Sequence, residues 1–375
     1  MQINTRIFVL AMLAGAPAFG AGSKADLPGG GEVPIDELSE LRADTVRLKV
    51  QRGNFFAVPI PLSSPTFGTG LALGGAYFYP QTEEQRQSQP ASLTGVAGVY
   101  TNNDSYAFGV GQQSYWKADT WRFTGVAGYA NFRLELIDPA PDEDGSLDWL
   151  VRGLFTQASL SRRVAGDWYL GGQLVYLDIS QELVVTETDP RYLVGDNIRS
   201  LGAGILTEYD TRDLPSNPWQ GSYFSAKALA SRASGDVSES YQSYFARYRY
   251  YYKTRWPVVL AADINGCAKS GAIPLWDTCR LSLRGFPLTD YLGTQSLYGQ
   301  AEVRWQAYKR FGLVAFGGWG YVANSVSDEL RDERVPSYGA GVRFMVLKSK
   351  RINVRLDFAR SRDSDAVYLG VGEAF

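Results

Sequence analysis

The chain has 375 residues, a net charge of −2 and no histidine. The nearly neutral charge excludes a general nucleic-acid-binding or anionic-membrane-binding protein. The lack of histidine excludes Ser-His-Asp hydrolysis and histidine metal sites. We therefore expect a protein that is not an enzyme and that has no cofactor and no metal. Its length is compatible with a single large all-β domain.

The N-terminus, residues 1–20, has the pattern of a cleavable secretory signal peptide. Arg6 supplies the positive charge, an apolar stretch follows it, and small residues precede the expected cleavage site. A membrane anchor is the alternative, but the apolar stretch is short for a membrane-spanning helix. Residues 21–43 are rich in glycine and acidic residues and predict a short periplasmic leader. One β-barrel domain is expected over residues 44–375.

The two cysteines, Cys267 and Cys279, both lie in a predicted long loop at residues 266–296. An even number of closely spaced cysteines in an exported protein favours a disulfide between them. Two free thiols are the alternative. A metal site is not expected, because no further cysteine or histidine could complete one.

Apolar and polar residues alternate in strand-length runs through the rest of the chain. In the run at 351–360, apolar residues at the even positions alternate with Asn353, Arg355 and Asp357. Most runs reach the roughly 9–11 residues of a tilted membrane strand. Charges of both signs on the polar face favour a wet lumen and an apolar face toward lipid over a dry soluble core. The runs cover residues 45–58, 68–79, 91–101, 105–116, 120–137, 149–162, 166–177, 198–210, 221–233, 241–254, 256–267, 297–308, 311–323, 337–347, 351–360 and 365–375.

The connections between these runs alternate between short and long. Short turns are expected at 164–166, 308–310 and 348–350. Long connections are expected at 138–148, 180–197, 233–240, 266–296 and 324–335. This alternation is typical of bacterial outer-membrane barrels, whose short turns face the periplasm. Both ends of such a barrel lie in the periplasm only if the strand number is even. The run at 45–58, closed by Pro59 and Pro61, is therefore counted as the first of sixteen strands.

Three further segments carry motifs. The first, at 209–224, contains Asp210, Arg212, Asp213 and Gly221, which alone indicate only a well-formed turn. The second is Arg284-Gly285-Phe286 in the long loop, and the third is the chain end at 370–375, which finishes with Phe375. In this order and at this strand spacing, the segments resemble the bacterial surface antigen superfamily, the BamA/TamA-type outer-membrane assembly and translocation barrels. The resemblance covers residues 200–375 well and the first half of the chain only by pattern.

The resemblance implies that the loop folds inward and that Arg284 pairs with an acidic residue inside the lumen. Superfamily members carry this acid in a Phe-x-Asp-x-Gly pattern. Phe316 and Gly320 match that pattern, but Gly318 stands in the acidic position. Glu302 and Asp357 face the lumen by alternation, and we expect them to be the carboxylate partners of Arg284 instead.

The resemblance also implies a function in assembling or translocating outer-membrane proteins. Phe375 is then expected to end the last strand as an edge-pairing signal for membrane insertion. Superfamily members usually carry periplasmic POTRA domains, for which residues 21–43 leave no room. We expect a monomer among outer-membrane lipids, with nascent outer-membrane or exported proteins as partners and no nucleic acid. A passive or loop-gated pore and a structural barrel for a partner complex are the alternatives.

Overall fold

The computed structural model of the chain describes most residues from position 53 onward. The described ranges are 53–64, 68–136, 146–186, 191–214, 217–235, 238–286, 291–325, 335–348, 351–362 and 364–375. The predicted signal peptide, the leader and the start of the first predicted strand lie outside them. Within these ranges no helix has the length and apolar character needed to cross a membrane.

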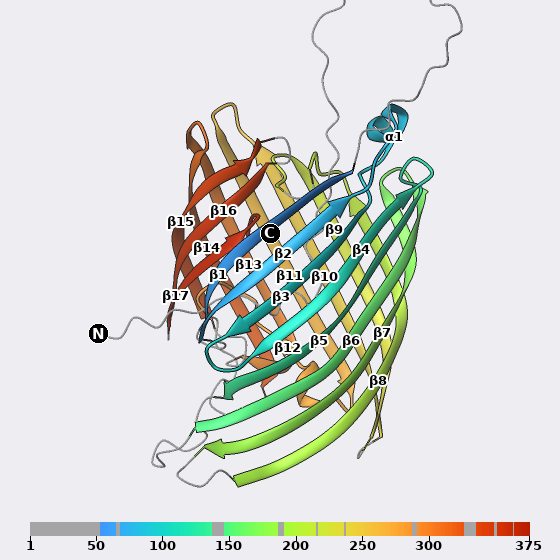
Figure 1. The fold of residues 1–375 in the computed structure, drawn as a ribbon, viewed down its shortest axis with the longest axis vertical. Coiled ribbons are helices and arrows are strands. Elements are labelled where there is room, and N and C mark those ends of the chain that lie inside the picture. The colour runs from blue at the N-terminus through green and yellow to red at the C-terminus, as the bar shows by residue number, and fades with distance from the viewer. Residues whose placement is uncertain are drawn as a thin grey trace, which may run out of the picture.

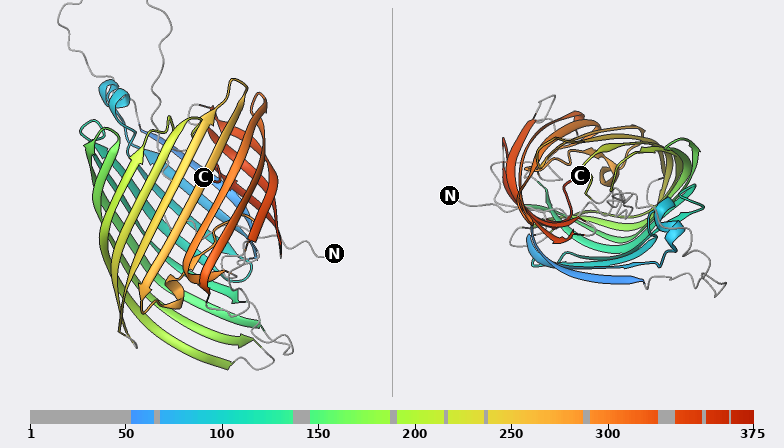
Figure 2. Two further views of the ribbon diagram at one scale, coloured as in Figure 1. Left: turned by 180° about the vertical axis from the view of Figure 1, so that it is seen from behind. Right: turned by 90° about the horizontal axis from the view of Figure 1, so that it is seen from above.

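Sixteen long strands form one antiparallel sheet, as the sequence predicts, and each strand pairs with the next in the chain. Figures 1 and 2 show the sheet curling into a barrel around a lumen. The strands are β1 (Asn54–Ser64), β2 (Gly68–Phe78), β3 (Leu93–Thr101), β4 (Tyr106–Trp116), β5 (Trp121–Leu136), β6 (Ser146–Ala165), β7 (Trp168–Thr186), β8 (Arg191–Asp210), β9 (Gly221–Gly235), β10 (Glu239–Lys253), β11 (Val258–Gly271), β13 (Leu292–Tyr308), β14 (Phe311–Ser325), β15 (Val335–Leu347), β16 (Ile352–Ser361) and β17 (Asp365–Val371).

Short elements lie between some of the long strands. Helix α1 (Glu83–Ser88) lies between β2 and β3, and a single 3₁₀ turn, η3 (Leu275–Asp277), follows β11. The two-residue strand β12 (Cys279–Arg280) pairs with the beginning of β13. These last two elements belong to the long loop between β11 and β13, which continues into the lumen.

The barrel wall is apolar outside and polar inside. On β13, Val303 and Trp305 are each 47% exposed, whereas Glu302 and Arg304 on the opposite face are 2% and 8% exposed. A soluble protein would bury the apolar set and expose the charged one. The reversed arrangement is the one that a lipid-facing belt around a polar lumen requires.

Several predicted long connections are strand instead. The sequence predicts a connection at 180–197, but β7 and β8 remain paired there, for example at Ser180↔Asn197. The loop predicted at 233–240 is also largely occupied by β9 and β10. In β7, residues 180–182 are polar in succession and residues 183–185 are apolar in succession, so the alternation that marks the membrane belt stops before the pairing does. Backbone hydrogen bonds alone continue the ladder.

The prediction that Pro59 and Pro61 end the first strand is wrong, because both lie inside β1. The register between β1 and β2 runs without a bulge past both prolines. Proline nitrogens cannot donate to a ladder, and residues two apart direct their backbone groups toward the same edge. Both prolines therefore face away from β2, toward β17, and β1 is an edge strand.

The seam between β1 and β17 differs from the other strand contacts. The two strands lie side by side, with Cα atoms within 8 Å of each other. Across the described residues, however, no registered ladder joins them, whereas every other neighbouring pair of long strands has one. The missing donors of Pro59 and Pro61 explain why a regular ladder is not formed at this edge.

The chain end also departs from the prediction of a strand running to Phe375. Strand β17 stops at Val371, and Gly372 turns the chain with a φ of +89°, a conformation that favours glycine. The segment 372–375 leaves the sheet and enters the lumen, where the chain end is visible within the ring of strands (Figure 2).

Candidate functional site in the lumen

A disulfide ties the long loop to the barrel wall. Cys267 on β11 bonds to Cys279 on β12, with 5.8 Å between their Cα atoms. Lys269 also pairs with Asp277 at 2.6 Å. The disulfide and the ion pair therefore fix the first part of the loop to the wall before the loop turns inward.

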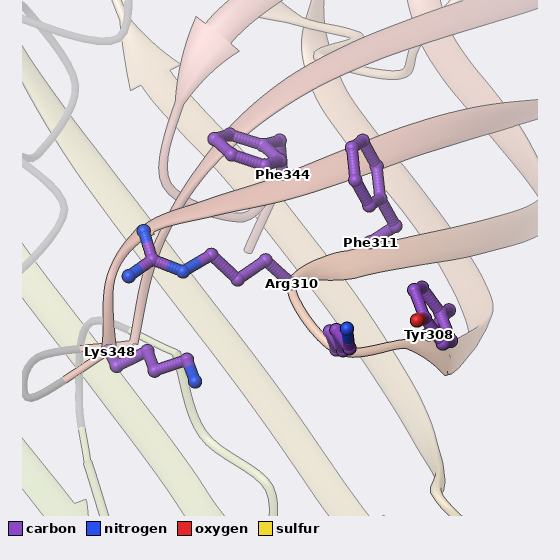
Figure 3. A pocket seen from close by; sticks show the side chains of 6 residues that line it. Tyr308, Arg310, Phe311, Phe344 and Lys348 are labelled. Atoms are coloured by element: carbon purple, nitrogen blue, oxygen red, sulfur yellow. The ribbon is translucent and has the colours of Figure 1, made fainter.

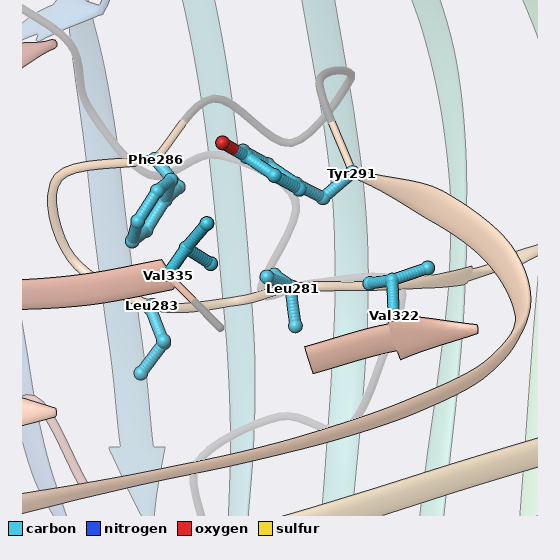
Figure 4. Packing of buried hydrophobic residues seen from close by; sticks show 6 residues of the cluster. All are labelled: Leu281, Leu283, Phe286, Tyr291, Val322 and Val335. Carbon is cyan, nitrogen blue, oxygen red and sulfur yellow. The ribbon is translucent and has the colours of Figure 1, made fainter. Parts of the chain in front are cut away.

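An apolar cluster holds the next part of the loop against the inner face of β14 and β15. Figure 4 shows its members, Leu281, Leu283, Phe286, Tyr291, Val322 and Val335. Phe286 and Tyr291 meet edge to face, with ring centroids 5.2 Å apart. Gly320 provides the necessary space, because a Cβ there would lie 2.8 Å from a methyl group of Leu281. The predicted pattern residue Gly320 thus lies directly beneath the loop.

Arg284 lies between two carboxylates inside the lumen. Its Nη1 donates to Asp357 at 3.0 Å, and its Nη2 donates to Glu302. The guanidinium also lies over the Phe316 ring, 3.4 Å from the centroid, at cation–π distance. Arg284 is only 2% exposed and Asp357 is fully buried. The structure thus brings together four of the residues singled out from the sequence.

Gly318 remains on the lumen face, but its neighbour on β13 occupies the space of the missing acid. Gly318 pairs with Gln300, and a Cβ at Gly318 would lie 2.9 Å from the Gln300 Cβ. Gln300 Oε1 accepts hydrogen bonds from Arg284 Nε and Nη2 at 3.3 and 3.0 Å. The acceptors of the Arg284 guanidinium are therefore the Gln300 amide and the carboxylates on β13 and β16.

Gly285 fixes the loop tip through its backbone. Its N–H donates to the Tyr368 hydroxyl at 2.7 Å, and its carbonyl accepts from the Ser364 hydroxyl. Its φ is +99°, and a Cβ there would lie 3.2 Å from backbone atoms at Arg360 and Ser361. Glycine is therefore required at this position both by conformation and by space.

The two carboxylates also serve other arginines. Asp357 accepts from Arg343 and, at 3.4 Å, from Arg355 Nη1, while Glu302 accepts from Arg304 Nε at 2.7 Å. Such charges are retained in a buried site only when they are paired and hydrogen-bonded. Gly341 leaves room for this network, because a Cβ there would overlap the Asp357 carboxylate at 1.9 Å.

The chain end joins the same network from the other side. Glu373 accepts from Arg343 Nε at 2.8 Å and from Asn353 Nδ2 at 2.6 Å. Burial raises the pKa of Glu373, but Arg343 and Arg304 together outweigh burial and lower the pKa below its ordinary value of 4.5. The carboxylate is therefore charged at neutral pH and holds segment 372–375 in place.

Phe375 is the apolar part of this attachment. Its side chain packs with Tyr251 and Ala261, and its main-chain oxygen accepts from Arg304 Nη2 at 2.9 Å. Arg304 thus links the chain end to Glu302, and through it to Arg284. The loop tip and the chain end are held by one shared charge network.

The turn motif forms a separate contact at the tight-turn rim. Arg212 binds Asp210 with two hydrogen bonds at 2.8 and 3.0 Å. Asp213 accepts from Arg351 Nη1 at 2.6 Å, and Arg351 lies in the turn between β15 and β16. Gly221 adopts a φ of +105° where the chain enters β9. The motif therefore connects the turn between β8 and β9 to the turn between β15 and β16. In the barrel wall, these two turns are separated by β10, β11, β13 and β14.

Arg304, Arg343, Asn353 and Glu373 were not predicted as site residues, although Asn353 was placed on the polar face of its strand. Alternation with Glu302 would have placed Arg304 on the lumen face, and the same pattern applies to Arg343 on β15. Glu373 had no such signal, because the turn at Gly372 ends the strand pattern before it.

Together, the fold and the lumen define a class, a sixteen-stranded antiparallel barrel with an inward-folded loop. No protein-family model matches the chain, and no curated protein matches it in sequence. The solved structures with a similar fold include BamA and two CdiB proteins. BamA from Haemophilus ducreyi lacking POTRA domains 1–3 has a TM-score of 0.54 at 12% identity, over 86% of this chain and 69% of that chain.

The other two are CdiB barrels. CdiB from Escherichia coli has a TM-score of 0.57 at 13% identity, over 86% of this chain and 62% of its own. CdiB from Acinetobacter baumannii has a TM-score of 0.55 at 12% identity, over 84% and 57%. The chain thus spans less than two thirds of the CdiB structures. At these identities the similarity shows the fold.

Proposed function

We propose that this chain is an integral barrel of the bacterial outer membrane that helps to assemble or translocate other proteins at its seam between β1 and β17. The exposed apolar belt and the fold shared with BamA and CdiB support the membrane placement. The order of the turn motif, the Arg284 loop and the chain end supports the assembly role through the superfamily resemblance.

The observation that carries the proposal is the seam. The strands on either side of it are each laddered to one neighbour only within the described residues, so opening the seam breaks no regular ladder. An open β-edge pairs readily with another strand. Because Pro59 and Pro61 remove donors from the edge of β1, the edge of β17 offers fuller pairing to an incoming strand.

The lumen contacts explain how the barrel remains closed without this ladder. Segment 372–375 follows β17 directly, and Glu373 and Phe375 fasten it to β10, β13 and β15. Tyr368 on β17 also receives the N–H of Gly285. The last strand is therefore held from inside, by side chains that can exchange partners, rather than by a backbone ladder to β1.

A covalent lock across the seam tests the proposal. Cysteines at Ala57 and Leu369 would be joined by a short thiol cross-linker in cells, and the native Cys267–Cys279 disulfide would be retained. The control lock joins Leu71 to Tyr100, which are registered partners on β2 and β3. The readout is the abundance of folded barrels and exported proteins in the outer membrane when only the locked protein is produced.

The proposal predicts that the seam lock depletes a set of outer-membrane or exported proteins, whereas the control lock does not. An unchanged outer-membrane proteome with the seam fully cross-linked contradicts an assembly or translocation role.

A loop-gated pore is the second candidate function, and the lumen contacts of Arg284 are the observation that favours it. Removing the guanidinium would free the loop tip that now lies across the lumen. A pore function predicts a higher single-channel conductance for R284A than for the wild type in planar bilayers, with no effect of the seam lock. Equal conductance would exclude Arg284 as a gate.

A further inference from the structure

A pocket of about 260 Å³ lies at the tight-turn rim, outside the lumen site described above. It is formed where the turn between β13 and β14 meets the turn between β15 and β16 (Figure 3). Three cationic and three aromatic side chains line it, and none of its lining residues is acidic. They are Tyr308, Lys309, Arg310, Phe311, Phe344 and Lys348.

The aromatic part of the pocket faces outward. Phe311 and Phe344 are registered partners on β14 and β15, and their ring centroids are 5.0 Å apart. They are 52% and 38% exposed and share the outer face with Leu313 and Val342. Aromatic rings at this level of a barrel form the girdle between the apolar belt and the water. The pocket therefore opens at the height of lipid head groups.

The other part of the pocket is cationic. Among the residues that the structure describes, no carboxylate pairs with Lys309, Arg310 or Lys348. Arg351 in the same region is, by contrast, already paired across the mouth of the lumen. Lys309 sits in the turn with a φ of +48° and its Nζ lies 4.9 Å from the centroid of the Tyr308 ring. Three positive charges are thus gathered around a concave surface and remain available to an external anion.

We propose that this pocket binds the head group of an anionic phospholipid from the adjoining membrane leaflet. The phosphate would lie among Lys309, Arg310 and Lys348, and an acyl chain would cover the Phe311 and Phe344 rings. Long basic side chains reach head groups from the edge of an apolar surface in this way. The chain's net charge of −2 does not oppose this, because the cations are local.

The alternative occupants of the pocket differ in the side chains that they contact. Water around three solvated cations needs neither the pocket nor the rings, and a free phosphate ion needs only the cations. A phospholipid uses both the cations and the apolar floor, which here adjoin one another. The site depends on the membrane placement proposed above, but not on the assembly or translocation activity.

Lipid binding is tested on the detergent-purified protein by native mass spectrometry. The probes are phosphatidylglycerol and phosphatidylcholine with the same acyl chains, each with and without excess inorganic phosphate. The site variant is K309Q/R310Q. The control variant K117Q/R162Q removes one lysine and one arginine elsewhere on the same rim. Lys117 lies in the turn after β4 with a similarly positive φ of +50°, and Arg162 lies on β6. Heat-dependent gel mobility verifies that each barrel is folded.

We expect one phosphatidylglycerol to be retained per barrel in preference to phosphatidylcholine, also in excess phosphate. In K309Q/R310Q its affinity should fall by about 30-fold, as expected for two head-group contacts, while K117Q/R162Q should bind as the wild type does. Equal retention of the two lipids, or equal losses in both variants, would overturn the site. Displacement by inorganic phosphate would indicate a free-anion site, and absence of any bound lipid would speak against the membrane placement itself.

Discussion

At the scale of single residues, Arg284 is the contact on which the lumen depends. A buried guanidinium is tolerated only where carboxylates and further acceptors surround it, and Glu302, Asp357 and Gln300 provide them. Each carboxylate is shared with a second arginine, so removing Arg284 does not leave it without a partner. These side chains therefore form one connected network, so a substitution at one residue alters the contacts of several others.

Replacing Arg284 with alanine should destabilise the barrel and loosen the loop. Loss of one partner from a buried ionic group typically costs about 3–5 kcal/mol, and the shared arginines place the expected loss in the free energy of unfolding at the lower end. A urea titration of the barrel in micelles measures it. The exposed Arg199, which pairs with Asp178 at 3.3 Å, supplies the control R199A, for which little change is expected.

Double-mutant cycles would divide this effect between the two carboxylates. R284A combined with E302Q or D357N should be less destabilising than the sum of the single changes. Additive losses for both combinations would mean that the guanidinium acts mainly through Phe316 and Gln300.

Glu373 makes the attachment of segment 372–375 dependent on pH. Its pKa is lowered in the folded protein, so its contribution to holding segment 372–375 is complete above pH 4.5 and is lost as pH falls through the lowered pKa. Arg343, Arg304 and Asn353 face it, and the like charge of Glu302 opposes them. Amide exchange at 373–375, corrected for intrinsic rates, should therefore accelerate below pH 4.5. In E373Q it should already be fast at pH 7 and change little with acid; a wild-type-like profile in E373Q would contradict the assignment.

At the scale of elements, most strands were predictable because alternation survives wherever one face meets lipid and the other the lumen. The same rule gave the lumen positions of Glu302 and Asp357. It failed for β7 and β8 beyond the belt, where polar and apolar residues come in short runs rather than in alternation while the ladder continues. It also failed at Gly372, because a single left-handed glycine redirects the chain without changing the pattern before it.

Strand β1 shows why proline has to be interpreted by position. Proline suggests a strand end in a central strand, but an edge strand accepts it on its unpaired side. The sequence alone did not show which edge of the first strand would lack a partner. The structure shows that this edge faces β17, and the two prolines on it explain why the seam has no regular ladder.

Restoring the missing donors should therefore tighten the seam. P59V/P61V supplies two N–H groups toward β17, and we expect amide exchange along residues 365–371 to slow by about tenfold, the equivalent of one or two net hydrogen bonds. Exchange mass spectrometry measures this, with the laddered β3 as internal reference. Unchanged exchange in β17 would show that the prolines do not limit pairing there.

At the scale of the whole molecule, side-chain contacts cross the lumen in more than one place, whereas the wall is weakest at the seam between β1 and β17. The Asp213–Arg351 pair connects turns across the mouth, and the loop and chain end meet around Glu302 and Arg304. Within the described residues the wall is a continuous ladder from β1 to β17 through fifteen strand-to-strand pairings, and the closing contact between β17 and β1 has no registered ladder there. We therefore expect the barrel to open sideways at this seam more easily than through the lumen.

The most direct measurement of this claim is the distance between β1 and β17 in a lipid bilayer. Nitroxide labels on cysteines at Ala57 and Leu369 report the seam, and labels at Leu71 and Tyr100 report a laddered pair. Pulsed electron paramagnetic resonance should give two distance populations at the seam, one closed and one open, and one narrow population at the control pair. A single narrow distribution at the seam, matching the control and unaffected by deletion of residues 372–375, would contradict a barrel that opens between β1 and β17.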